Sequence, residues 1–208
     1  MTNASIIRRV WENQADYQAD VLAAVASDSA DFEWDRTFAA VTEVLESVDL
    51  STPEARWQGL VELCRVAGAA NVAALRESPI WPTWIGVWAL AASGEAHEYR
   101  PRIESALVEA YSTHALRFEE AYAGLAAYFG LGLQEPLTVR QFAIAAESLA
   151  EGSALRHHVS APDMEGILRP TGPGGELQPW TLFGVGLEAL VRQFFSLDPD
   201  FVPPGGTA

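Results

Sequence analysis

The sequence predicts an all-α protein, and two observations support this fold class. Apolar side chains recur every three to four residues over most of the 208 residues, which is the period of a helix with one buried face. Stretches in which apolar and polar residues alternate, as in a half-buried strand, are almost absent. With 49% apolar residues the chain is long enough to bury one sizeable core, so we expect one main domain.

The first half of the chain is predicted to form five helices. Three short ones precede residue 52, over residues 3–11, 13–26 and 33–48. Thr52 and Pro53 then form a cap and a first-turn proline, which open a helix through Leu75. A short, very apolar helix follows over residues 80–92 and ends before a glycine.

The clearest element is one long helix over residues 101–129, where apolar and aromatic side chains keep the spacing of three and four throughout. Gly130 and Gly132 break it, and Thr138 begins another helix through about His157.

The last part of the chain is predicted to contain a loop, a helix and a tail. The loop is rich in proline and glycine and covers residues 161–179, and the final helix covers residues 180–197. The tail over residues 198–208 has three prolines and two glycines and is predicted to be disordered.

Charge and cysteine content limit the classes of function. The net charge is −15, and the 13 basic residues are all arginine. Only Arg8 and Arg9 are adjacent, so the rest of the chain is not expected to bind the phosphate backbone of a nucleic acid. A single cysteine, Cys64, excludes an internal disulfide and fits a reducing cytoplasm. No apolar run reaches the length of a membrane span or a signal peptide, so we expect a cytoplasmic protein.

The motifs that carry catalytic chemistry are missing. The sequence has no His-Glu-x-x-His, no phosphate-binding loop and no Glu-x-x-His pair, so we predict no enzyme, no metal and no cofactor. Glu147 and Glu151 share a helix face, which is usually a solvated one. Gly184 and Gly186 resemble a dinucleotide fingerprint, but that motif works only after a strand, and none is predicted here, so we expect the two glycines to allow close approach of another helix.

Polar side chains interrupt two apolar stripes. His114 lies between Tyr111 and Phe118 on the long helix, and Asn71 lies on the stripe that begins with Trp57. Each of the two side chains either forms a hydrogen bond within an ordinary hydrophobic core or contacts a ligand in a cavity. The many aromatic residues nearby likewise form either an ordinary core or the wall of a ligand cavity.

Read in order, these helices resemble the C-terminal body of TetR-family transcriptional regulators, over roughly residues 12–197. The most family-like stretches are Trp88-Ala-Leu-Ala, the helix over residues 137–152 and the closing segment over residues 187–195. The resemblance implies a bundle of about eight to nine helices, with residues 13–197 forming a ligand-binding and dimerisation domain.

The resemblance also implies two sets of site residues. The last two helices pair with those of a second copy, which makes dimer-interface candidates of Phe142, Ala146, Leu149, Ser153, Leu187, Leu190, Val191 and Phe194. A small effector binds between the long helix and the helices before it, which makes cavity candidates of Trp57, Cys64, Asn71, Trp84, Trp88, Tyr111, His114, Phe118 and Tyr122. Packing within one chain is the alternative for the dimer set, because an amphipathic face does not specify its partner.

The first 12 residues resemble the end of the family's DNA-binding helix-turn-helix. Trp11 matches the aromatic anchor after the recognition helix, Asn13 matches the cap of the next helix, and the DNA-contact candidates are Asn3, Ser5, Arg8 and Arg9. Two preceding helices are missing, so either the true start lies upstream or the chain is a remnant. A lone recognition helix is not held rigidly enough for operator binding.

We therefore expect a TetR-like transcriptional regulator that forms a homodimer and binds a small apolar or aromatic effector, with operator DNA a partner only if the helix-turn-helix is complete. The effector acts by favouring one dimer conformation. The alternatives are an interaction module that heterodimerises with intact regulators and, more remotely, a helical-bundle enzyme whose site residues lie far apart in sequence.

Overall fold

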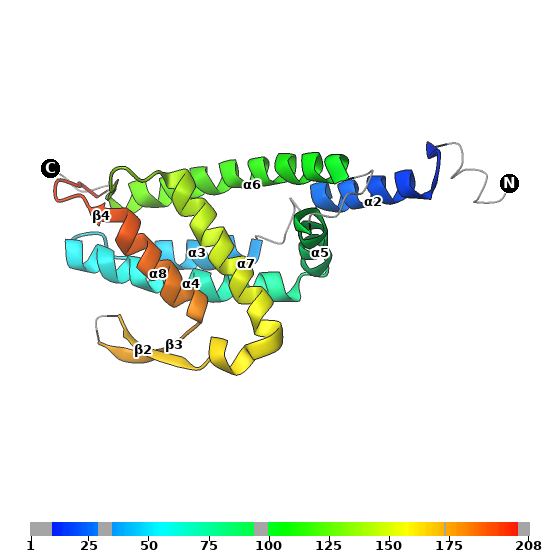
Figure 1. The fold of residues 1–208 in the computed structure, drawn as a ribbon. Coiled ribbons are helices and arrows are strands. Elements are labelled where there is room, and N and C mark those ends of the chain that lie inside the picture. Colours follow the sequence, from blue (N-terminus) through cyan, green and yellow to red (C-terminus); the bar gives the residue numbers. More distant parts are fainter. Residues whose placement is uncertain (1–9, 29–34, 94–99, 173, 204–208) are drawn as a thin grey trace. The chain divides into compact units, whose positions relative to one another are not determined.

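The structure is a computed structural model that describes residues 10–28, 35–93, 100–172 and 174–203. Within these ranges it is mainly helical (Figure 1), with helices α2 (Gln14–Asp28), α3 (Asp35–Ser47), α4 (Pro53–Glu77), α5 (Trp81–Ala92), α6 (Arg100–Phe129), α7 (Val139–Met164) and α8 (Leu182–Phe194). Four short strands form two antiparallel pairs: β1 (Leu131–Leu133) with β4 (Phe195–Leu197), and β2 (Ile167–Thr171) with β3 (Glu176–Trp180).

The chain divides into two compact units. Unit 1 comprises Met1–Phe32 and Ser78–His114, and unit 2 comprises Glu33–Glu77 and Ala115–Ala208, so the division falls within α6. In unit 1 the buried side chains of Val87, Ile103 and Leu107 form the core, with α2 packed on α5. In unit 2, α4 packs against α3, α7 and α8.

The predicted helices are confirmed from α2 through α6, with bounds that differ by two residues or fewer. Asn13 does cap α2, because its side-chain oxygen accepts a hydrogen bond of 2.9 Å from the backbone N–H of Asp16. Thr52 caps α4 in the same way, accepting from the N–H of Ala55 at 3.1 Å. Thr138 forms a capping box with Gln141 at the start of α7, so helix starts were readable from the sequence.

The end of the chain differs from the prediction. The structure continues α7 to Met164 across a kink at Ser160, and it ends the last helix at Phe194, where the backbone becomes extended and pairs with β1. The predicted first helix lies almost wholly outside the described residues, which hold seven helices of the expected eight to nine. From the predicted tail, residues 198–203 are described, and the ring of Phe201 lies 4.7 Å from the Arg56 guanidinium carbon.

The predicted loop over residues 161–179 is wrong, because most of it forms the β2–β3 hairpin. Gly172 and Gly175 adopt positive φ angles of 76° and 63°, which close the turn. Pro170 and Pro179 lie within these strands, because both strands of an isolated pair are edges, where a residue whose nitrogen faces outward needs no hydrogen-bond partner. Trp180 and Thr171 are buried on the inner face, so the hairpin packs against the helices.

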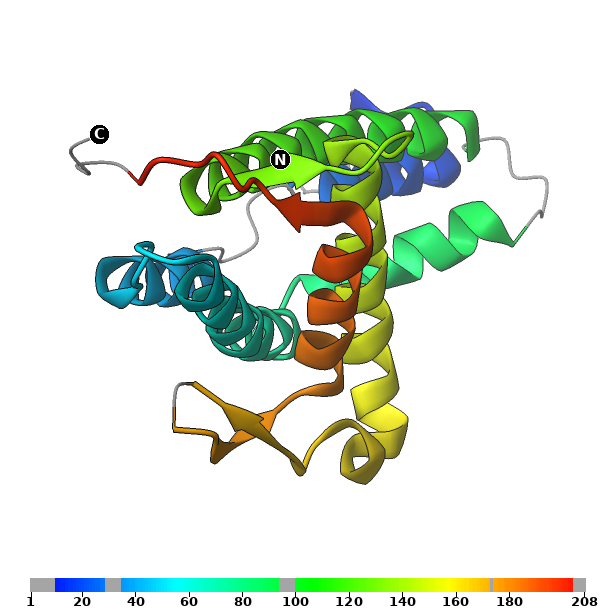
Figure 2. The ribbon, with the colours of Figure 1, turned by 90° about the vertical axis from the view of Figure 1, so that its left-hand side faces the viewer.

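Helices α4 and α8 cross with their backbones in contact (Figure 2). A Cβ atom placed on Gly68 would lie 2.9 Å from the Cα atom of Gly184, and one placed on Gly184 would lie 3.1 Å from the carbonyl oxygen of Cys64. A Cβ atom on Gly186 would lie 2.5 Å from a methyl group of Leu149 in α7. The predicted role of these glycines in close helix approach is confirmed. A strand, β3, does precede them, but they lie inside α8 and not in a phosphate-binding turn.

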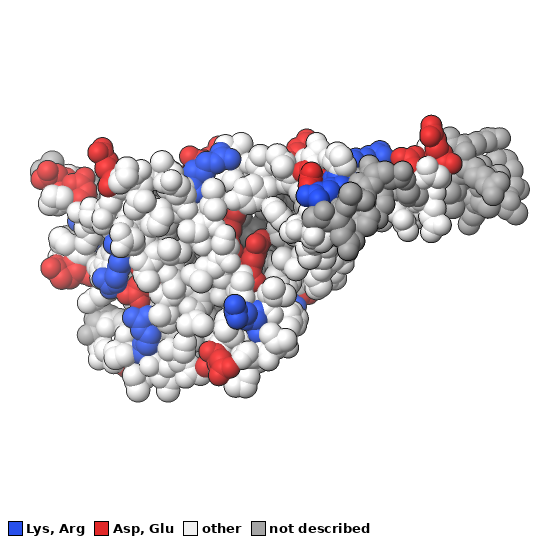
Figure 3. Space-filling view, in the orientation of Figure 1, with Lys and Arg blue, Asp and Glu red and all other residues white. Residues whose placement is uncertain are grey.

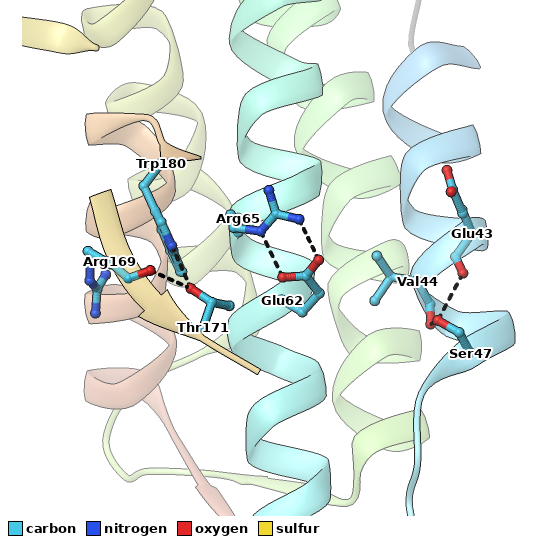
Figure 4. Close-up of polar contacts among 8 residues, drawn as sticks. All are labelled: Glu43, Val44, Ser47, Glu62, Arg65, Arg169, Thr171 and Trp180. Atoms are coloured by element: carbon cyan, nitrogen blue, oxygen red, sulfur yellow. Dashed lines mark hydrogen bonds and ion pairs between the residues drawn. The ribbon is translucent and has the colours of Figure 1, made fainter. Parts of the chain in front are cut away.

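A buried carboxylate joins α8 to the hairpin. The side chain of Glu188 is 7% exposed, and Arg169 from β2 and Arg192 from α8 lie 2.8 Å and 2.7 Å from its two oxygens. Each guanidinium also covers an indole ring, Arg169 over Trp180 and Arg192 over Trp57. The Trp180 indole N–H donates to the Thr171 hydroxyl at 2.9 Å (Figure 4). These contacts fix the hairpin against α8.

A buried arginine joins α4 to the far end of α6. Arg56 is 3% exposed and donates hydrogen bonds to the carbonyl oxygens of Phe129 at 3.1 Å, Gly130 at 3.4 Å and Asp198 at 3.0 Å. The last carbonyl groups of a helix have no hydrogen-bond donor within the helix, and they carry partial negative charge. The Arg56 guanidinium supplies both hydrogen bonds and positive charge there.

Substitution of Gly68 by alanine is expected to destabilise the protein, because the added methyl group meets the backbone of α8, which cannot rotate away. We expect the melting temperature to fall by several degrees, corresponding to an overpacking cost of about 1–3 kcal/mol. Gly152→Ala in α7 is the matched control, since its methyl group would meet nothing within 4 Å. That variant should melt at or above the parent temperature in circular dichroism, and equal melting of the two variants would contradict the close crossing.

Candidate ligand cavity

A cavity of about 380 Å³ lies within unit 2. Its walls come from α3, α4 and the second half of α6, and α8 closes it together with single side chains from α7 and both short strands of the β1–β4 pair. The exposed lining residues Phe38 and Gly124 mark its mouth. This volume lies within the usual range for small-molecule sites, which is about 300–1,000 Å³.

The lining is almost entirely apolar. The residues are Thr37, Phe38, Val41, Leu45, Leu60, Leu63, Cys64, Ala67, Asn71, Phe118, Ala121, Tyr122, Gly124, Leu125, Ala126, Tyr128, Leu131, Phe142, Phe183, Leu187, Val191 and Phe195. None of these residues is charged, and among the five polar ones the Tyr128 hydroxyl already donates to the carbonyl oxygen of Leu45 at 2.9 Å. The cavity therefore offers apolar surface and a few polar atoms.

Two titratable groups of the lining, Cys64 and Tyr122, are held in their neutral forms. Burial raises the pKa of the Cys64 thiol to about 12, with the Glu188 carboxylate adding to the effect. Burial also raises the pKa of Tyr122 above its ordinary value, helped by the nearby charge of Glu147. A nucleophilic cysteine needs a lowered pKa, so the arrangement favours binding over covalent chemistry.

The structure brings four of the nine predicted cavity residues together in this lining: Cys64, Asn71, Phe118 and Tyr122. Trp57 lies elsewhere, beneath the guanidinium of Arg192 at 4.1 Å. The other four, Trp84, Trp88, Tyr111 and His114, belong to unit 1, where Trp88 contacts both Trp84 and Tyr111 edge to face. The aromatic residues that stood out in the sequence therefore divide between the two units.

Sequence reasoning missed the contributions of α3 and α8. Thr37, Phe38, Val41 and Leu45 line the cavity from α3, and their three-and-four spacing was visible in the sequence. Phe183, Leu187 and Val191 recur every four residues in α8, but two of them had been assigned to the dimer set. A periodic stripe predicts that a face is covered and does not say by what.

The predicted dimer residues are mostly covered by their own chain. Six of the eight are buried within it: Phe142, Ala146, Ser153, Leu187, Val191 and Phe194. The Phe142 ring contacts Tyr122 and Phe194, with ring centroids 4.8 Å and 5.4 Å away. Leu149 and Leu190 keep part of their surface. The exposed apolar side chains of these helices are others, Leu155 and Val159 in α7 and Leu182 in α8.

No DNA-contact candidate can be placed, because Asn3, Ser5, Arg8 and Arg9 lie outside the described residues. On the face drawn in Figure 3, arginine side chains form small separate groups among carboxylates and large uncharged areas. Within the described ranges no helix is both long and apolar enough to cross a bilayer. The same ranges hold no group of three or more histidine, cysteine, aspartate or glutamate residues that could bind a metal ion.

Glu147 and Glu151 lie on one face of α7, and this face is not the solvated one predicted. Both side chains are partly buried, and this burial raises the pKa of each to about 7, with Glu151 also raising that of Glu147. One oxygen of Glu147 is fully buried without a hydrogen-bond partner among the described residues. These groups carry a proton over part of the physiological pH range.

Comparisons with known proteins add no identity, because no protein-family model, curated protein or solved structure matches this chain.

The two raised carboxyl pKa values predict a loss of stability as the pH rises. Between the ordinary pKa of 4.5 and about 7 the folded chain keeps protons that the unfolded chain releases, so the free energy of unfolding falls across this window. Replacing both residues by glutamine removes the free-energy cost of ionising these carboxyl groups in the folded protein. At pH 8 the double variant should melt about 2–6 °C above the parent, taking on the order of 1–2 kcal/mol for a partly exposed pair.

At pH 4.5 the same double variant and the parent should melt close together, because both carboxyl groups are then protonated. Glu46→Gln, at an exposed position on α3, is the control and should change neither melting temperature. If the double variant melts no further above the parent at pH 8 than at pH 4.5, then ionisation of the two carboxyl groups does not destabilise the folded protein, and the prediction is wrong.

Proposed function

We propose that unit 2 binds a small, largely apolar molecule in the cavity between α3, α4 and α6, and that the chain is a TetR-like regulator whose effector site this is. The observation that carries the proposal is the cavity itself, with its uncharged lining and open mouth. Well-formed apolar cavities with a few polar atoms are the usual form of small-molecule sites. A neutral thiol and phenol favour a sensor or carrier over a catalyst.

The regulator part of the proposal is supported by the order of the elements. The cavity lies between the long helix α6 and the helices that precede it, as the resemblance to TetR-type regulators implies. Such an effector would act by binding one conformation of the regulator more tightly than the other. A ligand shifts the equilibrium between two conformations only by its difference in affinity for them. Operator DNA is a partner only with a complete helix-turn-helix.

Cavity binding can be tested with N-phenyl-1-naphthylamine, an uncharged dye that fluoresces in apolar surroundings. We expect saturable fluorescence enhancement that Ala121→Phe weakens by at least about tenfold, or about 1.4 kcal/mol, because the new ring occupies the cavity. Ala123→Phe is the matched control, placing the same ring on the exposed face of the same helix. Dye binding that survives Ala121→Phe in a folded protein would place the dye elsewhere.

Dimer formation is a separate part of the proposal. Because most of the predicted dimer side chains are buried within the chain, we expect the contact to use the exposed apolar side chains Leu155, Val159 and Leu182. Light scattering at tens of micromolar should give twice the chain mass of 22.5 kDa, and Leu155→Glu should halve it. Leu168→Glu in the hairpin is an equally exposed control that should leave the mass unchanged. A monomeric parent protein would refute the dimer.

A further inference from the structure

The exposure of the lining residues differs from one wall of the cavity to another. The lining side chains from α7, α8 and β4 are all buried: Phe142, Phe183, Leu187, Val191 and Phe195. None of the four lining side chains from α3 is buried, and Phe38 among them is 50% exposed. In α6 the lining residue Gly124 is exposed as well. The cavity therefore opens to solvent where α3 and α6 line it.

Helices α3 and α6 are joined at their C-terminal ends. The Tyr128 hydroxyl of α6 donates to the carbonyl oxygen of Leu45 in α3 at 2.9 Å. Val48, which follows α3, and Phe129, the last residue of α6, both lie against Gly59 of α4. This end of the cavity is therefore closed by a hydrogen bond and by packed side chains.

The open part of the cavity lies before this junction. One turn before Tyr128, α6 carries Gly124, and one turn before Leu45, α3 carries Val41; both residues line the cavity. Phe38 lies a further three residues back along α3. Because Gly124 has no side chain, α6 contributes only backbone to the lining at this position.

The packing of α6 does not require a glycine at position 124. A Cβ atom placed there would meet nothing within 4 Å among the described residues, whereas one placed on Gly68 would meet the backbone of α8 at 2.9 Å. The φ angle of Gly124 is not positive, so any residue can adopt its backbone conformation. A glycine inside a helix is destabilising relative to most other residues. What its missing side chain leaves is open space at the mouth of the cavity.

Building on the proposed function, we infer that the ligand enters and leaves this cavity between α3 and α6, and that Gly124 keeps the entrance open, with Phe38 at its edge. A larger side chain at position 124 would cover the entrance, and a smaller one at position 38 would widen it. The ligand contacts the buried lining beyond the entrance. A change at the entrance therefore alters the barrier that the ligand crosses in both directions, and it leaves the affinity nearly unchanged.

Stopped-flow fluorescence of N-phenyl-1-naphthylamine tests the entrance, because the observed rate at increasing protein concentration gives both rate constants. We expect Gly124→Leu to lower the association and dissociation rate constants together by about tenfold, which is an added barrier of about 1.4 kcal/mol. The Kd should change by less than about twofold.

Gly86→Leu is the matched control for this substitution. Gly86 is also an exposed helical glycine whose Cβ atom would meet nothing within 4 Å, but it lies in α5, outside the lining. This variant should leave both rate constants unchanged. Both leucine variants should melt at or above the temperature of the parent, because leucine favours a helix, so unfolding would not explain a slower rate.

Phe38→Ala is the converse variant, because it removes a half-exposed ring from the edge of the entrance. We expect it to raise both rate constants. A Phe38→Ala protein that binds and releases the dye no faster than the parent would remove Phe38 from the entrance and count against the inference.

The outcomes separate the inference from the proposed function. If Gly124→Leu leaves both rate constants unchanged, the ligand enters elsewhere, and the inference is overturned while the cavity stands. If it weakens the Kd by raising the dissociation rate constant alone, the new side chain contacts the bound ligand, and position 124 belongs to the binding wall and not to the entrance. If the dye does not bind the parent protein at all, the proposed function fails and the inference fails with it.

Discussion

The contact between Gly68 and Gly184 sets the geometry of unit 2. Because neither residue has a side chain, α4 and α8 meet backbone to backbone, and α8 lies close enough to place Leu187 and Val191 beneath the cavity. Gly186 extends the same tight packing to α7 through Leu149. Helices α4 and α8 are thereby held at a spacing that larger residues would not permit, since packed backbones cannot yield as side chains do.

Buried charges then fix the parts that surround this crossing. Glu188 is held by two arginines, one from its own helix and one from the hairpin, so a shift of the hairpin would take one of the two cations away from a buried carboxylate. Arg56, in the first turn of α4, has a corresponding role, because it satisfies carbonyl groups at the end of α6 and after β4. Such groups contribute less net stability than apolar packing of equal volume, but they specify one arrangement of the elements.

The cavity is what remains between these fixed parts. Helix α3 covers α4 through Val44 and Leu63, and the second half of α6 joins the same core through Phe129, which leaves an apolar space further along the helices. Its lining keeps thiol and phenol neutral and contains no charge, so its selectivity rests on shape and on the few polar atoms. Glu147 and Glu151 on α7 show the same effect of burial on acids, which retain protons near neutral pH.

Local signals determined the helices and their starts. The three-and-four spacing, the caps at Asn13, Thr52 and Thr138, and the close-packing glycines in α8 were readable from the sequence because each acts over a few residues. The β1–β4 pair was missed because its two strands lie far apart in the sequence. The β2–β3 hairpin was missed because its prolines and glycines read as a loop. Amphipathic stripes show that a face is buried, and only the tertiary structure decided which element buries it. That is why Phe142 and Leu187, assigned to a second chain, line the cavity of their own chain, while Trp84 and Trp88 lie in unit 1.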